Sequence, residues 1–111
     1  MEIIYRSNKL EKQLTDEKEI IKAYGKIRGI KLRQRLDHLY QSPTLAVVKF
    51  IPGARLHPLI GDKQGTWAVY IIKNWRLCFI ITHDPIPELE DGGIDLEQVT
   101  AIEIISVTDY H

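Results

Sequence analysis

The sequence predicts one α+β domain over residues 1–111, with an N-terminal strand and two or three helices packed on a mostly antiparallel sheet of four to five strands. Three observations lead to this prediction. Apolar residues in the first half recur with the period of a helix, and the second half holds runs of β-branched and aromatic residues separated by turn residues. The length of 111 residues suits a single hydrophobic core.

The first half opens with a β-prone stretch, residues 2–6, followed by helix-start signals. Ser7 or Asn8 begins a helix, because polar side chains of this kind cap the first free backbone N–H groups. Asp16 and Glu19 have capping-box spacing, which predicts that a second helix starts there.

The second helical segment runs towards Ser42-Pro43, where a proline ends it. Its apolar period slips near Gly25, so we expect a break or a bend at that glycine. Basic side chains occupy the face opposite the apolar one: Lys22, Lys26, Arg28, Lys31, Arg33 and Arg35.

The second half has the pattern of strands. Residues 54–59, 66–72, 75–82 and 99–107 are β-prone, and Lys73-Asn74 forms a tight hairpin turn in which Asn adopts positive φ. Between the last two strands lies a Pro- and Gly-containing acidic loop, residues 83–98.

The net charge of zero conceals a division along the chain. Residues 1–57 carry 12 Lys/Arg against 6 Asp/Glu, and residues 58–111 carry 3 against 9, with 6 of these 9 acids inside the acidic loop. The basic remainder suits a polyanionic partner, although a charge cluster is more often a solvated face. A single cysteine, Cys78, and no leader or membrane-length apolar run favour a cytoplasmic protein without membrane contact.

Three motifs in the second half follow one another in a specific order: R-L-H-P-L-I-G-D-K-Q-G-T-W (residues 55–67), N-W-R (residues 74–76) and a terminal D-Y-H (residues 109–111). In order and spacing they resemble HigB-type toxins of the RelE/ParE superfamily, also called plasmid maintenance killer proteins. The resemblance covers roughly the C-terminal half, and the helical segment "LRQRLDHL" resembles the family more weakly.

The resemblance implies a RelE-like fold and a toxin that is neutralised by a cognate helix-turn-helix antitoxin of the HigA kind. Such toxins enter the ribosomal A site and cleave messenger RNA (mRNA) there, without a metal or another cofactor. The 2′-hydroxyl of the substrate attacks the adjacent phosphate and yields a cyclic phosphate.

This reaction needs a base, an acid and a positive charge near the phosphate. His57 and His111 suit the proton transfers, because an imidazole titrates near pH ~6.5. Asp109 would orient an imidazole or act as the base, and Arg76 would grip the scissile phosphate. Tyr110 would stack on a base or donate to the phosphate. Four further residues are candidate RNA contacts: Lys63, Lys22, Lys26 and Arg33.

The residues by themselves leave other interpretations open. His57 would then be structural, Arg76 would pair with Glu103 on a neighbouring strand, and Tyr110 would face the core. The basic helix face would also suit an acidic antitoxin.

Two departures from the family pattern weaken the functional assignment. Ile60 stands where many relatives have a lysine that stabilises the transition state, and residues 83–98 form an insertion before the last strand. We expect this acidic loop to lie away from the surface that faces ribosomal RNA. Two alternative functions therefore remain: a ParE-like poison of gyrase that cleaves nothing, and a degenerate member that binds its antitoxin in autoregulation.

Overall fold

The computed structural model describes residues 1–60 and 65–110, and it has helices in the first half and strands mostly in the second. The helices are α1 (Asn8–Thr15), α2 (Glu17–Tyr24), α3 (Lys26–Gln41), α4 (Leu45–Val48) and the 3₁₀ helix η2 (Leu96–Gln98). The strands are β1 (Glu2–Tyr5), β2 (His57–Pro58), β3 (Thr66–Ile72), β4 (Trp75–Ile81) and β5 (Ala101–Asp109). The predicted α+β class is confirmed.

The five strands form one sheet in the order β1-β5-β4-β3-β2. Three of the four pairings are antiparallel, and β1 pairs with β5 in parallel, so the sheet is mixed. Local sequence patterns cannot reveal the parallel pairing, because it joins residues about a hundred positions apart in the chain.

Capping residues delimit the helices as the sequence predicted. Ser7 accepts from the Leu10 N–H at the start of α1, and Asp16 accepts from Lys18 and Glu19 at the start of α2. Asp16 also ends α1, so one residue separates the two helices. The short α4 was not predicted, because its four apolar residues have no helical period of their own.

Gly25 ends α2 and precedes α3 with φ 82°, ψ 167°, a conformation that other residues adopt only with strain. Gly29 lies inside α3 with ordinary helical φ, and a Cβ there would lie 3.7 Å from Ile20 Cγ2, an unstrained contact.

The two glycines are therefore expected to respond to alanine with opposite signs. Gly25→Ala should lower the free energy of unfolding by about 1–3 kcal/mol, and Gly29→Ala should raise it by about 0.5–1 kcal/mol. Urea unfolding midpoints measure both changes. Two shifts in the same direction would contradict the conformations described for these positions.

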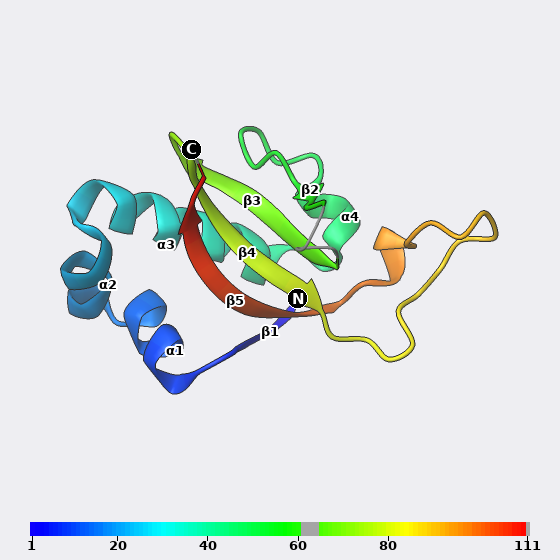
Figure 1. Cartoon of the computed structure of the whole chain (residues 1–111), viewed down its shortest axis with the longest axis horizontal. Coiled ribbons are helices and arrows are strands. Elements are labelled where there is room, and N and C mark those ends of the chain that lie inside the picture. The colour runs from blue at the N-terminus through cyan, green and yellow to red at the C-terminus, as the bar shows by residue number, and fades with distance from the viewer. Residues whose placement is uncertain (61–64, 111) are drawn as a thin grey trace.

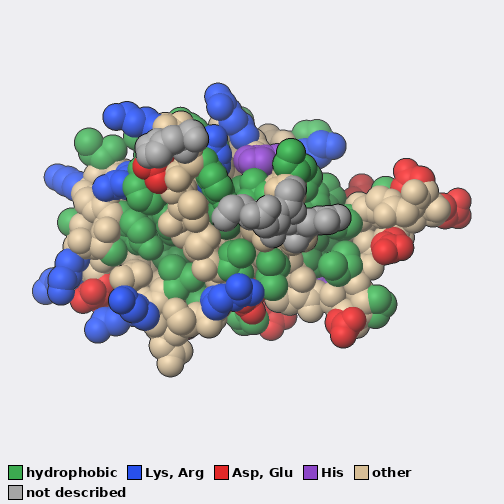
Figure 2. Space-filling view, viewed as in Figure 1, with side chains coloured by type: hydrophobic (Ala, Val, Ile, Leu, Met, Phe, Trp, Pro, Cys, Tyr) green, Lys and Arg blue, Asp and Glu red, His purple; other side chains and the backbone are tan. Residues whose placement is uncertain are grey.

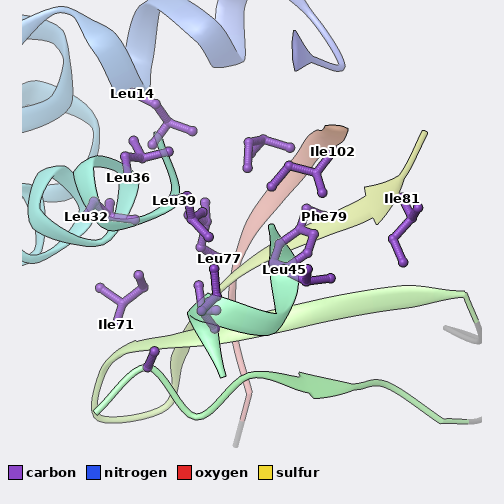
Figure 3. Packing of buried hydrophobic residues seen from close by; sticks show 14 of the residues in the cluster. Leu14, Leu32, Leu36, Leu39, Leu45, Ile71, Leu77, Phe79, Ile81 and Ile102 are labelled. Carbon is purple, nitrogen blue, oxygen red and sulfur yellow. The ribbon is translucent and has the colours of Figure 1, made fainter. Parts of the chain in front are cut away.

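The hydrophobic core lies between α3 and one face of the sheet. Leu32, Leu36 and Leu39 of α3 meet Leu77 and Phe79 of β4, and all five are at most 2% exposed (Figure 3). Because strand side chains alternate, the residues that pair across β3, β4 and β5 with these core positions share one face. The intervening positions point to the opposite face, which none of the described helices covers (Figure 1). We call it the open face.

Residues 83–98 project from the end of the sheet remote from α1 and α2 (Figure 1). Acidic side chains gather on this projection, whereas basic side chains gather over the helices and above the sheet (Figure 2). The loop has internal order: Leu89 N–H donates to Gly93 O (2.7 Å) and Asp95 N–H to Pro87 O (2.9 Å). No helix in the described residues is long and apolar enough to cross a bilayer.

Candidate functional site

Strand register brings several polar side chains to the open face. His57, Ala68, Cys78 and Ser106 form one row across the sheet, since each is the pairing partner of the next. Two residues further along the strands lies the row of Tyr70, Arg76 and Thr108. These two adjacent rows contain two of the predicted site residues, His57 and Arg76.

The imidazole of His57 is oriented by the backbone. Its Nδ1 lies 2.6 Å from the carbonyl oxygen of Arg55. Because a carbonyl oxygen only accepts, Nδ1 carries a proton, and in the neutral form of the ring Nε2 is the nitrogen that accepts. Within the described residues Nε2 has no hydrogen-bond partner, so it is available to accept a proton from a ligand.

The strand that carries His57 is shorter than predicted. Only His57–Pro58 forms ladder pairs, instead of residues 54–59. Arg55 has φ 49°, which interrupts the extended chain. Outside the ladder pairs, the Ala54 carbonyl accepts from the Tyr70 N–H (2.7 Å) and the Leu59 N–H donates to the Thr66 carbonyl (2.8 Å). In the β3–β4 hairpin the positive φ likewise falls on Lys73 (53°), where the sequence suggested Asn74.

Arg76 is held at the hairpin by its own backbone surroundings. Its Nη1 donates to the carbonyl oxygens of Lys73 and Trp75, each at 3.1 Å, and its guanidinium lies 4.9 Å from the ring centroid of Tyr70. The alternative interpretation, in which Arg76 pairs with Glu103, is wrong. Glu103 instead forms an ion pair with Arg6 at 2.8 Å.

Tyr110 extends β5 onto the open face. Its N–H donates to Asn74 O (2.9 Å), and its hydroxyl lies 3.7 Å from the buried thiol of Cys78. The alternative in which Tyr110 faces the core is therefore wrong. Burial of the Tyr110 phenol raises its pKa to about 12, and the contact with Cys78 contributes to this rise. The positive charge of Arg76 lowers the pKa by a smaller amount. The neutral phenol acts at physiological pH as a hydrogen-bonding group and not as a base.

Asp109 lies on the other side of the strand. It pairs with Trp75, and Trp75 packs against the hydrophobic core on the helix-covered face. Alternation along β5 thus separates Asp109 from Arg76 and Tyr110. Two further predicted site residues, Lys63 and His111, lie outside the described residues.

The predicted RNA contacts on the helices are exposed. Lys22 and Lys26 are solvent-exposed, and Lys26 lines a cleft of about 550 Å³ between the α2–α3 junction and the hairpin. Arg33 is also exposed, donates to Thr15 O (3.2 Å) and lies 3.9 Å from Asp37. All three belong to the helical layer and not to the open face.

Arg35 is buried, although its position in the helix suggested a solvated side chain. It is 8% exposed, and its Nε donates to Tyr70 O (2.9 Å) while Nη2 donates to Gly53 O (3.3 Å). Burial lowers the pKa of its guanidinium. Arg35 therefore joins α3 to β3 and to the segment before β2.

Sequence reasoning missed Arg55, Tyr70 and Cys78 as members of this surface. The period-2 alternation within 66–72 and 75–82 was a usable signal for Tyr70 and Cys78, which fall on the same side as Arg76. Arg55 has no such signal, because its position depends on a backbone turn.

The comparison with solved structures gives the same fold. The chain is similar to a YoeB/ParE toxin from Agrobacterium tumefaciens, with a TM-score of 0.57, 14% identity and coverage of 100% of both chains. This confirms the RelE-like fold. No protein-family model and no curated protein sequence matches the chain.

Proposed function

We propose that this chain is the HigB-type toxin of a toxin–antitoxin pair and that it acts as a ribosome-dependent mRNA endonuclease. The observation that carries the proposal is the open face, where His57 Nε2 has no hydrogen-bond partner among the described residues and Arg76 and Tyr110 lie on the same surface. Two strand spacings across the sheet and a two-residue offset along the strands put the backbones of His57 and Arg76 about 12 Å apart. We propose that their side chains bridge this span around one phosphodiester.

In this proposal His57 Nε2 removes the proton of the 2′-hydroxyl, whose oxygen then attacks the adjacent phosphorus. Arg76 holds the non-bridging oxygens with the guanidinium edge that its backbone contacts leave available. We assign protonation of the departing 5′-oxygen to His111, because an imidazole suits a proton transfer near neutral pH. The products are a 2′,3′-cyclic phosphate and a 5′-hydroxyl. Asp109 has no step here, because it lies on the opposite face from Arg76.

We propose that the exposed surface of α2 and α3 binds the antitoxin. Ile21, Ile27 and Ile30 are 44%, 70% and 57% exposed on α2 and α3. They lie among the basic side chains Lys22, Lys26 and Arg33, and an acidic amphipathic segment would cover both kinds of side chain.

Induced expression in bacterial cells, followed by primer extension on their mRNA, tests the function. We expect growth arrest and new 5′ ends in translated messages, both reversed when the antitoxin is co-expressed. Growth arrest with intact messages and inhibited supercoiling would indicate a gyrase poison instead. Normal growth would indicate a member that only binds its antitoxin.

A further inference from the structure

We infer that Arg55, Tyr70 and Arg76 together form a phosphodiester-binding clamp on the open face, in which Arg55 supplies the second cation of the site. The inference rests on the proposed function and identifies how the chain holds the RNA backbone where Ile60 replaces the usual lysine.

The first observation is that two guanidinium groups share one aromatic ring. The Cζ atoms of Arg55 and Arg76 lie 4.8 Å and 4.9 Å from the centroid of Tyr70. They approach from opposite sides of β3, because Arg76 belongs to β4 and Arg55 to the segment that leads into β2. Both distances are within the range of cation–π attraction, which holds two like charges near each other before a ligand arrives.

The second observation concerns charge. The described residues contain two ion pairs, Arg6–Glu103 and Arg33–Asp37, and neither includes Arg55 or Arg76. The acid nearest to Arg76 in strand register, Asp109, lies on the other face. The described part of the open face therefore presents two uncompensated positive charges that an anion would neutralise.

The third observation connects the clamp to the proton acceptor. Arg55 has φ 49°, and its carbonyl oxygen accepts the proton of His57 Nδ1 at 2.6 Å. One residue thus orients the imidazole through its backbone and contributes a cation through its side chain. The exposed Ile60, 89% accessible, offers no cation of its own.

The ligand class follows from the geometry of the groups. Planar guanidiniums bind two oxygens of a phosphate at once, and their flat faces also accept a stacked base. A segment of single-stranded RNA offers both groups, with the phosphate between the two arginines. Tyr70 contacts the arginines on both sides of β3 and is a positioning residue.

Binding of a short single-stranded RNA whose 2′-hydroxyls are methylated, and which therefore cannot be cleaved, tests the clamp on the full-length chain. We expect Arg55→Gln to weaken binding about 10- to 100-fold and to reduce the slope of log affinity against log salt by about 0.7. Tyr70→Leu should weaken binding similarly, and Tyr70→Phe, which keeps the ring, should restore it. Lys9→Gln on α1 removes the same charge elsewhere and should have little effect.

Equal binding by Arg55→Gln and Lys9→Gln, or no salt-dependent binding by the unchanged chain, would overturn the clamp. Circular dichroism confirms that each variant is folded. Cleavage of ribosome-bound mRNA is measured in parallel. If Arg55→Gln cleaves mRNA at the normal rate, the clamp is wrong and the proposed nuclease function is supported. If the unchanged chain binds RNA through Arg55 and does not cleave mRNA, the clamp is supported and the proposed nuclease function is wrong.

Discussion

His57→Ala is expected to lower the rate of mRNA cleavage on the ribosome by about 10²- to 10⁴-fold, the usual contribution of one acid or base group. The reason is that His57 presents its Nε2 to the open face while the Arg55 carbonyl occupies Nδ1. Alanine removes the proton acceptor and leaves the guanidinium of Arg76 in place. Primer extension on a translated message measures the rate, and induced cells should resume growth.

A matched histidine control is available in the same chain. His83 lies at the base of the acidic loop, where its Nε2 accepts from the Thr100 N–H at 2.9 Å. His83→Ala should retain cleavage, because this ring is engaged with the backbone away from the row that contains His57. Antitoxin binding should be unchanged in both variants. Full toxicity of His57→Ala would remove the chemical basis of the proposed nuclease.

Phe79→Ala is expected to cost about 3–5 kcal/mol of unfolding free energy. Phe79 is 0% exposed on β4, paired with Trp67 and Ile104, and its ring fills the space between the sheet and the helices. The total free energy of unfolding of a domain of this size is roughly 5–15 kcal/mol, so this single change would remove a large part of its stability.

The second phenylalanine of the chain provides the comparison. Phe50 is 81% exposed after α4, and Phe50→Ala should change the free energy of unfolding by about 0.5 kcal/mol or less. Urea unfolding of the two variants gives midpoints and slopes to compare. Because the substitution is the same at both positions, a difference between the midpoints reports the effect of burial. Equal midpoints would mean that Phe79 does not occupy the core.

Local signals predicted most of the individual elements. Strand 66–72 has the predicted bounds, 75–82 is one residue too long, and the helix break at Gly25 occurs as expected. The last strand was predicted two residues too early, because its polar end, which includes Thr108 and Asp109, pairs with β4 in spite of its composition. Cross-strand hydrogen bonding therefore extended the strand beyond its apolar run.

The candidate site was only partly readable from the sequence. The motif order named His57, Arg76 and Tyr110, and these three share the open face. The D-Y-H motif also named Asp109, but alternation along β5 puts its side chain on the face opposite Arg76 and Tyr110. Arg35 was assigned to a solvated surface because a helical period alone does not indicate which arginine meets a neighbouring strand.

The sequence by itself determined most of the secondary structure and the residue types available for chemistry, because helix caps, glycine breaks and alternating apolar residues act over a few positions. Only the tertiary structure decided which side chains share a surface: the parallel pairing of β1 with β5, the turn at Arg55 and the register that aligns Tyr70 with Arg76. The physical reason is that a one-residue change of register reverses the face of every side chain in a strand, and register depends on packing between segments far apart in the chain.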